Sequence, residues 1–405
     1  FSPLNFNTSE GYPFTAFRPP GATNKKYLFS LELDQDGYKC KGINQRLLNV
    51  MRYKQGLREN KIVPFTIFTD CLKDKRLPHE KNKIPGKTRV FSISPVDYSI
   101  QFRQYFLPYT VAHQNSRRTF STAVGINVLG KEWTAMVMEM NDFGRYQCDG
   151  DYSNFGSGFD MEVFSIVIDC LKDWFIFHGD DDQKNSDVRT ILLRELLSAK
   201  HLCYDIIYQV VSGMPSGSPI TVELNDLINY CYVCMAWHEI MSPFGYGSLY
   251  YFNKFVKKRT YGDDLWLAIR ELVIEYFNNV TLSEYFAKYG VKYTSASKGD
   301  DMIPYTDILN VSFLKRTPVP HPTRPNMFLA KLDLQSALDI ANWCWQSRDP
   351  VSSTLVNIEA CNDALYGFGP ETHEYYRKIL LKQAHRLGKQ GNLRSWAELD
   401  HLYLG

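Results

Sequence analysis

Apolar residues recur with a helical period in the middle of the chain. Between 164 and 175 they fall at intervals of three and four, as one buried face of an α-helix requires. The residues of this face are Phe164, Val167, Ile168, Leu171, Trp174 and Phe175. By contrast, 132–140 has the pattern of a strand, and 1–105 mixes short apolar segments with Pro, Gly and basic loops. The pattern predicts a protein of mixed α and β structure.

A second helix is predicted from a Ser-Pro pair onwards. Ser218 suits the N-cap and Pro219 the first helical position, and apolar residues continue towards Trp237. Further along, Tyr261-Gly262-Asp263-Asp264 predicts two short strands joined by a tight turn, because Gly tolerates a positive φ and Asp is a common turn residue. The turn would display two adjacent carboxylates.

The C-terminal part of the chain has a helical pattern. Helices are predicted over 333–346 and 371–387, and Gly388 is expected to stop the second. No repeat, low-complexity tract or flexible linker separates this part from the rest. With 405 residues, 44% of them apolar, the chain can bury an extensive core. We therefore expect one large domain or several coupled subdomains.

The sequence carries no membrane-spanning or export signal. Apolar stretches such as 164–177 are broken by Asp169, Lys172 and Asp173, and none is long enough to cross a bilayer. The chain begins Phe1-Ser2-Pro3-Leu4, without an initiating Met or the layout of a signal peptide. We expect it to start inside a longer precursor.

Cysteine usage favours a reducing compartment. The nine cysteines are scattered, and only Cys231 and Cys234 have a metal-like spacing, with no second pair to complete a zinc site. We therefore expect reduced thiols, no zinc site and a cytoplasmic location. The Asn-x-Ser/Thr sequences at Asn7, Asn279 and Asn310 would matter only in a secreted protein.

Positive charge is concentrated in one short stretch, although the formal net charge of the chain is only +2. The basic residues of this stretch are Lys73, Lys75, Arg76, Lys81, Lys83, Lys87 and Arg89, against Asp74 and Glu80. Such a stretch suits phosphate groups, while a solvated basic loop is the commoner role of a charge run.

Three aspartates could hold the metal ions of a phosphoryl transfer. Nucleotidyl transfer uses two ions beside the attacking hydroxyl and the leaving pyrophosphate, and magnesium prefers carboxylate oxygens. Asp263 and Asp264 lie on the predicted turn, and Asp151 ends an apolar segment. Each signal is weak alone, since Asp-Asp turns are usually solvated and 149–160 partly imitates a calcium loop. We discount calcium because Asn154 stands where that loop bends at a Gly.

Seven short segments follow one another along nearly the whole chain in an order that chance does not explain. They are Thr8-Ser9-Glu10-Gly11-Tyr12-Pro13; Leu72-Lys73-Asp74-Lys75-Arg76 with Gly86-Lys87-Thr88-Arg89; Asp151-Tyr152-Ser153-Asn154-Phe155; Ser212-Gly213-Met214-Pro215-Ser216-Gly217 with Thr221 and Asn225; Tyr261-Gly262-Asp263-Asp264; Tyr289-Gly290 with Lys298; and Phe313-Leu314-Lys315-Arg316. The series resembles the RNA-dependent RNA polymerases of picornavirus-like positive-strand viruses, most closely those of insect iflaviruses.

The resemblance implies an α+β right-hand polymerase with fingers, a palm built on an antiparallel sheet flanked by helices, and a helical thumb. It implies fingers at 1–105 and 193–212, a palm at 106–192 and 213–316, and a thumb at 317–405. Members of the family carry further residues ahead of this start, so we expect a shortened N-terminal fingers segment.

The implied activity is that of an RNA-directed RNA polymerase that uses two Mg²⁺ ions, with Mn²⁺ as a substitute. Asp151 and Asp263 would bind both ions, and Asp264 would support the site from the next position. Lys298 would be the general acid that protonates the leaving pyrophosphate.

The resemblance also assigns residues to the nucleotide and the RNA. Arg76, Lys87 and Arg89 would neutralise the incoming triphosphate, and Thr221 and Asn225 would bind near the ribose 2′ hydroxyl. The remaining assignments are Ser216 and Gly217 in a loop that shifts to admit the nucleotide, Ser9, Gly11 and Tyr12 for the template, Lys73 for the channel, and Lys315 and Arg316 for the primer strand.

Two features depart from the family's pattern. Gly156 stands where many relatives have a second aspartate that helps to recognise the ribose. Recognition would then rest on Asn225 and Thr221, or borrow a group such as Asp160. The strand leading into the Asp-Asp turn, 256–260, is also unusually basic.

The implied partners are an RNA template and primer, ribonucleoside triphosphates and a small viral protein primer. Membrane association would come only through other viral proteins, at replication complexes in the host cytoplasm. Two alternatives stay open. One is a catalytically weak polymerase-core fragment that binds RNA through the basic stretch alone. The other is a reverse transcriptase, which would carry an aromatic residue at about the position of Gly156.

Overall fold

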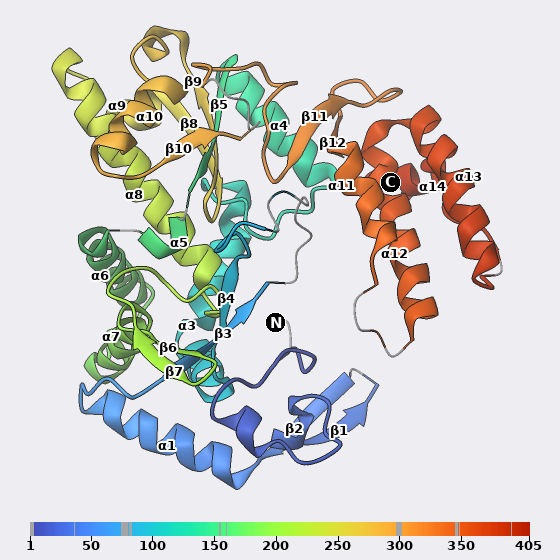
Figure 1. Cartoon of the computed structure of the whole chain (residues 1–405). Coiled ribbons are helices and arrows are strands. Elements are labelled where there is room, and N and C mark those ends of the chain that lie inside the picture. The colour runs from blue at the N-terminus through green and yellow to red at the C-terminus, as the bar shows by residue number, and fades with distance from the viewer. Residues whose placement is uncertain are drawn as a thin grey trace. The chain divides into compact units, whose positions relative to one another are not determined.

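The computed structural model describes residues 4–35, 37–73, 80, 83–153, 155–158, 160–296, 302–344, 347, 349–389 and 391–405. The chain forms two compact units, each assembled from two separate stretches (Figure 1). Unit 1 consists of 1–113 and 154–231, and unit 2 of 114–153 and 232–405. The chain therefore passes between the units after residues 113, 153 and 231, and helix α8 (Thr221–Met241) contributes residues to both.

Unit 1 combines β-sheets with helices. Its elements are η1 (Phe14–Phe17), η2 (Lys25–Leu28), β1 (Phe29–Asp34), β2 (Gly37–Ile43), α1 (Gln45–Glu59), β3 (Ile67–Leu72), β4 (Val90–Ile93), α3 (Val96–Asn115), α5 (Phe155–Gly158), α6 (Met161–Phe177), α7 (Gln183–Leu197), β6 (Lys200–Cys203) and β7 (Ile206–Gln209). Strands β1 and β2 form an antiparallel hairpin. The second sheet has the order β4-β3-β6-β7, in which β3 and β6 run parallel and the other neighbours antiparallel.

A buried ion pair links three helices of unit 1. The Arg58 guanidinium on α1 donates to Glu195 of α7 at 2.6 Å and to Gln101 of α3 at 2.5 Å. The side chains of Arg58 and Glu195 are completely buried. Because an unpaired charge in such a place would be strongly destabilising, the pair fixes α1 and α7 against each other.

Unit 2 is built around a second four-stranded sheet. Its elements are η3 (Ser116–Arg118), α4 (Lys131–Phe143), β5 (Tyr146–Tyr152), η4 (Ser242–Phe244), α9 (Leu249–Phe255), β8 (Val256–Tyr261), β9 (Asp264–Ile269), η5 (Glu271–Val273), α10 (Asn279–Lys288), β10 (Tyr293–Ser295), β11 (Arg316–Pro320), β12 (Phe328–Leu332), α11 (Leu334–Asp339), η6 (Ile340–Asn342), α12 (Pro350–Ala364), η7 (Leu365–Phe368), α13 (Pro370–Arg386) and α14 (Trp396–Leu404). The sheet has the order β10-β5-β9-β8 and is antiparallel throughout.

Helix α4 covers one face of this sheet. It contributes Trp133, Met136, Val137 and Met140 to a core cluster that also contains Trp266 of β9. Successive side chains of a strand point to opposite faces, so Trp266 lies on the face that Asp264 shares. The buried face of α4 thus holds the central strand in place.

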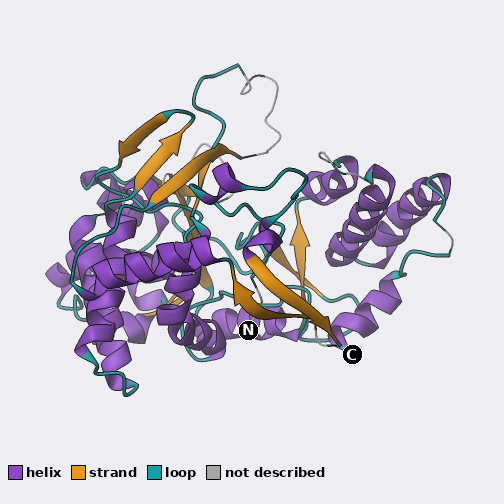
Figure 2. Ribbon diagram, turned by 90° about the horizontal axis from the view of Figure 1, so that it is seen from below, coloured by secondary structure: helices purple, strands orange, loops and turns teal. Residues whose placement is uncertain are grey.

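The C-terminal part of unit 2 is mainly helical (Figure 2). Helices α11, α12 and α13 share a core that includes Ala337, Ile358 and Leu380. Helix α14 is anchored separately, because the Trp396 indole donates to the carbonyl oxygen of Tyr366 at 3.0 Å and stacks on its ring.

Several expectations from the sequence are confirmed. Helix α6 carries the predicted apolar face, of which Phe164, Val167 and Leu171 are fully buried. The segment around Gly262 is a two-stranded hairpin, formed by β8 and β9. Helix α13 ends at Arg386, just before Gly388, which has a φ of 87°.

Other expectations are wrong. The segment 132–140 is helical and lies in α4, since the spacing of Trp133, Met136, Val137 and Met140 is that of a helix face. Helix α8 begins at Thr221 rather than at Pro219, because Ser218 and Pro219 form a turn ahead of it. The helix predicted over 333–346 ends as α11 at Asp339 and continues only as the short η6.

Two further findings bear on the predicted class of protein. Among the described residues, no helix is both long and apolar enough to span a membrane. The nine cysteine thiols are all free.

Gly150 on β5 lies directly against a tyrosine ring of the neighbouring strand. A Cβ atom added at Gly150 would lie 1.9 Å from Cζ of Tyr293 on β10. We predict that Gly150→Ala lowers the free energy of unfolding by about 1–3 kcal/mol, because the ring must move out of the core. Chemical denaturation would measure the loss.

Gly56→Ala is the matched control for this substitution. Gly56 lies in helix α1, and an added Cβ would meet nothing within 4 Å. Alanine should therefore stabilise the helix by up to about 1 kcal/mol. Equal effects of the two substitutions would contradict the packing that we describe for Gly150.

Candidate active site

The Asp263–Asp264 pair lies at the tip of the β8–β9 hairpin. Tyr261 pairs with Asp264, which leaves Gly262 and Asp263 as the two central residues of the turn. Gly262 has a φ of 65°, and Asp263 does not have a positive φ. A positive φ at the first central position alone is typical of a type II′ turn, which prefers Gly there. The local sequence therefore builds the turn that displays both carboxylates.

Strand β5 brings Asp151 to the same place. The pairing of β5 with β9 ends at Gly150 and Leu265, and the same antiparallel register sets Asp151 opposite Asp264. On its other side Asp151 pairs with Thr294 of β10. The structure therefore brings together the three predicted carboxylates, Asp151, Asp263 and Asp264, although they are far apart in the sequence.

The carboxylates interact electrostatically. Burial, together with the charges of Asp263 and Asp151, raises the pKa of Asp264 to about 6, and Lys315 acts in the opposite direction. Asp149, two residues before Asp151 on the same face of β5, has a pKa raised by burial. It accepts a hydrogen bond from the backbone N–H of Ser312 at 2.6 Å. Negative charge is thus crowded at this end of the sheet.

The donor set fits a hard divalent cation. Carboxylate oxygens are the ligands that magnesium prefers, and a bound cation would relieve the repulsion that raises the pKa of Asp264. Within the part of the chain that the structure describes, no three His, Cys, Asp or Glu side chains converge as tightly as a formed metal site requires. The three carboxylates therefore lie close enough to repel one another without forming a closed set of ligands.

The predicted primer-binding residues, Lys315 and Arg316, lie at a second tight turn. Phe313 and Arg316 exchange backbone hydrogen bonds of 2.9 Å, and Leu314 and Lys315 between them have φ values of 54° and 58°. Two central residues with positive φ define a type I′ turn, which usually contains Asn or Gly. Lys315 is exposed and interacts with Asp264. Arg316 is half-buried, and burial lowers its pKa.

Comparison with known proteins identifies the family. A family model described as "Viral RNA-dependent RNA polymerase" matches residues 1–386. The chain belongs to this family. It is 35% identical over 404 residues to the genome polyprotein of Deformed wing virus, and 31% identical over 371 residues to that of Rice tungro spherical virus strain Vt6. These matches cover 99% and 89% of this chain, but only 14% and 10% of the two polyproteins.

The fold agrees with the family. The solved structure of a Sicinivirus 3Dpol RNA dependent RNA polymerase superposes with a TM-score of 0.76 at 19% sequence identity, covering 99% of this chain and 77% of that one. The expected resemblance to picornavirus-like polymerases and the expected α+β right-hand fold are therefore confirmed. By family the chain is a viral RNA-dependent RNA polymerase.

Three of the basic candidates of the polymerase, Lys73, Lys87 and Arg89, lie in unit 1 next to strands β3 and β4. The backbone N–H of Lys73 donates to the carbonyl oxygen of Arg89 at 2.8 Å, which extends the β3–β4 ladder by one bond. Lys73, Lys87 and Arg89 are exposed. Arg76 and Lys298 lie outside the described residues. The hairpin thus presents cationic side chains from a fixed base.

The loop before α8 is held in unit 1 by its neighbours. The hydroxyl oxygen of Ser216 accepts a hydrogen bond from the backbone N–H of Ser92 at 3.2 Å, and Gly217 forms a bridge with Ile93. The Thr221 hydroxyl donates to the carbonyl oxygen of Ser218 at 3.0 Å. That hydroxyl therefore stabilises the start of α8.

Asn225, one turn into α8, has an unsatisfied oxygen. Its side-chain oxygen is buried, and none of the described residues forms a hydrogen bond with it. The other residue considered for the ribose, Asp160, is the N-cap of α6 and accepts from the backbone N–H groups of Glu162 and Val163. Asp160 is therefore engaged in the helix cap, whereas the side-chain oxygen of Asn225 has no partner among the described residues.

The predicted template residues have structural roles in unit 1. Gly11 has a φ of 71°, and a Cβ atom there would lie 2.8 Å from Cα of Pro95. The hydroxyl oxygen of Ser9 accepts from the backbone N–H of Gly11 at 3.2 Å. Tyr12 is half-buried. Close packing against Pro95 therefore requires Gly11.

The basic strand of the polymerase has a structural explanation in unit 2. Lys257 and Arg259 on β8 both form ion pairs with Glu139 of α4. Burial acts to raise the pKa of Glu139, but the two cations lower it below its ordinary value. Arg259 also donates to the carbonyl oxygen of Arg117 at 2.9 Å. These charges therefore join the strand to the helix behind it.

Sequence reasoning missed two residues near the carboxylates. Asp149 and Thr294 both lie beside Asp151, on β5 and β10 respectively. The alternation of side chains along a strand would have put Asp149 and Asp151 on one face. No local signal pointed to Thr294, because its pairing with β5 is set by the sheet.

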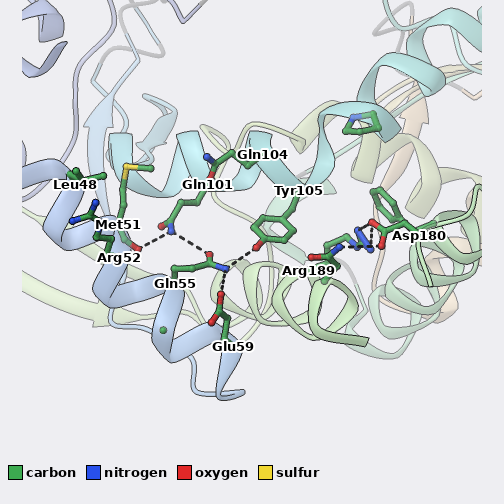
Figure 3. A pocket seen from close by; sticks show the side chains of 14 residues that line it. Leu48, Met51, Arg52, Gln55, Glu59, Gln101, Gln104, Tyr105, Asp180 and Arg189 are labelled. Carbon is green, nitrogen blue, oxygen red and sulfur yellow. Dashed lines mark hydrogen bonds and ion pairs between the residues drawn. The ribbon is translucent and has the colours of Figure 1, made fainter. Parts of the chain in front are cut away.

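A cavity of about 780 Å³ in unit 1 includes none of the predicted site residues (Figure 3). Several of its polar side chains bind one another. The Gln55 amide donates to Tyr105 at 2.7 Å and to Glu59 at 3.0 Å, while Arg189 donates to Asp180 at 2.7 Å. Because these groups already have partners, they do not indicate a ligand.

The crowding of carboxylates has a consequence for stability. Because the pKa of Asp264 is raised from 3.8 to about 6, its ionised form is less favourable in the folded protein than in the unfolded chain. The resulting loss of folding free energy is absent below pH 3.8, grows as the pH rises and is complete above about pH 6. We predict that Asp264→Asn stabilises the metal-free protein by about 1–2 kcal/mol at pH 8, and that the gain disappears towards pH 4.

Thermal unfolding in the presence of a chelator would test this prediction. Asp142→Asn, an exposed aspartate near the end of α4, is the control and should leave stability unchanged at either pH. A gain for Asp264→Asn that is the same at pH 4 and pH 8 would show that charge repulsion is not its cause.

Proposed function

We propose that this polymerase extends an RNA primer on an RNA template by two-metal nucleotidyl transfer. The observation that carries the proposal is the strand register that sets Asp151 opposite Asp264, beside the turn that bears Asp263. Asp151 and Asp263 would hold two Mg²⁺ ions, or Mn²⁺ in their place, and Asp264 would support them from the neighbouring position. Such ions supply charge neutralisation at the attacking 3′ hydroxyl and at the leaving pyrophosphate.

The residues of unit 1 would bind the incoming nucleotide. Lys87 and Arg89 are exposed on the basic hairpin and suit the triphosphate, where Arg76 would join them. The unsatisfied oxygen of Asn225 supports a hydrogen bond from the ribose 2′ hydroxyl. Thr221 would act beside it by holding the start of the helix. The loop of Ser216 and Gly217 would admit the nucleotide.

The RNA would be bound by other groups of the same chain. Lys315 and Arg316, at their strained turn, would contact phosphates of the primer strand. The assignments of Ser9, Gly11 and Tyr12 to the template, of Lys73 to the channel and of Lys298 to proton donation stay predictions. So does the division into fingers (1–105 and 193–212), palm (106–192 and 213–316) and thumb (317–405).

The biological role would be replication of a positive-strand viral RNA genome. The chain spans about one seventh of the first polyprotein it matches, so its relatives are parts of longer polyproteins. We propose that it works at replication complexes in the host cytoplasm, starts from a small viral protein primer and reaches membranes through other viral proteins.

Replacing one metal-binding carboxylate tests the chemistry. Asp263→Asn should reduce magnesium-dependent primer extension at least about 100-fold, because the loss of a ligand costs several kcal/mol of transition-state stabilisation. Binding of the primer–template should change little, since the carboxylate does not attract phosphate. Single-turnover extension and a binding titration would measure the two effects. Asp142→Asn is the control, and extension undiminished in Asp263→Asn would refute the metal assignment.

Replacing Asn225 tests ribose recognition. If its side chain binds the 2′ hydroxyl, Asn225→Ala should lower the preference for ribonucleotides over deoxynucleotides about tenfold. Deoxynucleotide incorporation is the internal control and should hardly change, because that substrate lacks the hydroxyl. A strong deoxynucleotide preference of the unaltered protein would instead favour the reverse transcriptase alternative.

A further inference from the structure

A row of polar side chains crosses the sheet β4-β3-β6-β7 in unit 1, with one residue from each strand. Ser92 of β4 is paired with Asp70 of β3, and His201 of β6 is paired with Tyr208 of β7. Between them, β3 and β6 are parallel neighbours. None of these four residues belongs to the chemistry proposed above.

Asp70 is the centre of the row. It accepts hydrogen bonds from the Ser92 hydroxyl at 2.7 Å, from Nδ1 of His201 at 2.9 Å and from the Tyr208 hydroxyl at 2.5 Å. Its side chain is only 4% exposed. Burial would raise the pKa of Asp70, but these donors lower it below its ordinary value. A buried carboxylate with three donors is held firmly in one position.

The imidazole ring of His201 is positioned by its hydrogen bond to Asp70. Because Nδ1 of His201 donates to Asp70, the other ring nitrogen, Nε2, must find its own partner. Nε2 is buried and has no hydrogen-bond partner among the described residues. The ring stacks on Tyr208 with a centroid distance of 5.3 Å. Removing the Asp70 charge would therefore loosen the contact between β3 and the β6–β7 hairpin.

Ser92 connects the row to the loop before α8. Strand β4 is at the edge of the sheet, where main-chain groups lack a strand partner. Its Ser92 N–H donates to the hydroxyl of Ser216 at 3.2 Å, and the Ser94 hydroxyl donates to the carbonyl oxygen of Gly217 at 3.0 Å. A Cβ atom at Gly217 would lie 2.0 Å from the carbonyl oxygen of Ser92. The loop is therefore seated directly on the edge of β4.

Strands β3 and β4, which carry Asp70 and Ser92, also form the basic hairpin. Asp70 lies three residues before Lys73, and Ser92 three residues after Arg89. The hydrogen bond from the N–H of Lys73 to the carbonyl oxygen of Arg89 closes the hairpin at 2.8 Å. The row thus lies at the base of the basic hairpin and next to the Ser216–Gly217 loop. Strand β4 forms one side of the hairpin and also binds the loop.

We propose that Asp70 is a positioning residue for nucleotide binding, which through Ser92 sets the Ser216–Gly217 loop relative to the basic hairpin. His201 and Tyr208 act with it by holding the carboxylate in place. The inference rests on the proposed function, because it takes the hairpin and the loop as the two segments that bind the nucleoside triphosphate. It adds that their relative position is set by a buried carboxylate that touches neither substrate nor metal.

The test uses Asp70→Asn in the full chain. The amide keeps the size of the side chain but loses the charge and one acceptor oxygen. We expect the KM for the incoming ribonucleotide to rise about fivefold while kcat changes less than twofold, because binding is displaced and the carboxylates of unit 2 are unaltered. The dissociation constant of magnesium GTP, measured without primer, should rise by a similar factor.

Three further variants separate positioning from loss of fold. Asp205→Asn, an exposed aspartate in the β6–β7 turn, is the matched control and should leave KM unchanged. Tyr208→Phe removes one donor and leaves Asp70 paired with Ser92 and His201, so its KM should rise about twofold. In the double variant Asp70→Asn/Ser216→Ala, the increase in KM over the unaltered chain should be smaller than the product of the two single increases. Both substitutions act on the same contact between β4 and the loop.

The outcomes distinguish the inference from the proposed function. Absence of RNA extension by the unaltered chain would refute the proposed function, while GTP affinity would still test the role of Asp70. An unchanged KM and GTP affinity in Asp70→Asn would overturn the inference alone. The inference would also be overturned if Asp70→Asn and Tyr208→Phe lost kcat and stability to the same extent while KM stayed unchanged. That result would indicate a purely structural role.

Discussion

The crowding of like charges at one end of a β-sheet is the constraint on which the rest of this structure depends. Asp151, Asp263 and Asp264 are drawn together by strand pairing, and their repulsion with burial raises the pKa of Asp264 to about 6. Such an arrangement opposes folding, and groups with strongly shifted pKa values are concentrated at functional sites. The antiparallel pairing around β5, the ring of Tyr293 against Gly150 and the core beneath Trp266 supply the rigidity that keeps the carboxylates in position.

Backbone strain is found at the same place. Leu314 and Lys315 both adopt a left-handed conformation that costs residues with a Cβ atom about 1–3 kcal/mol each when the surroundings impose it. The cation at the tip of this turn, Lys315, opposes the rise in the pKa of Asp264. The strained turn thus supplies positive charge where the sheet concentrates negative charge. A relaxed Asn-Gly turn would be easier to form, but it would bring no lysine to this position.

Features determined by short stretches of chain were predictable from sequence, and features set by distant pairings were not. The hairpin around Gly262 follows from turn chemistry, and α6 follows from its apolar period. The sequence wrongly predicts a strand at α4, because its Trp, Met and Val residues are common in both helices and strands. The pairing of Thr294 with Asp151 depends on sheet order, which no local pattern records. The role of Asp160 as the N-cap of α6 depends on where that helix starts, which the sequence pattern does not fix.

The two kinds of chemistry rest on different parts of the fold. The carboxylates of unit 2 stand on β5 and on the β8–β9 hairpin, inside a sheet with partners on both sides of β5 and β9. The candidates for nucleotide binding in unit 1 meet at β4, an edge strand of four residues that the Asp70 row ties to its neighbours. A short edge strand can shift more readily than an inner one, because half of its main-chain groups lack a strand partner. A shift of β4 would therefore move the candidate nucleotide-binding segments while the three carboxylates of unit 2 stay as they are.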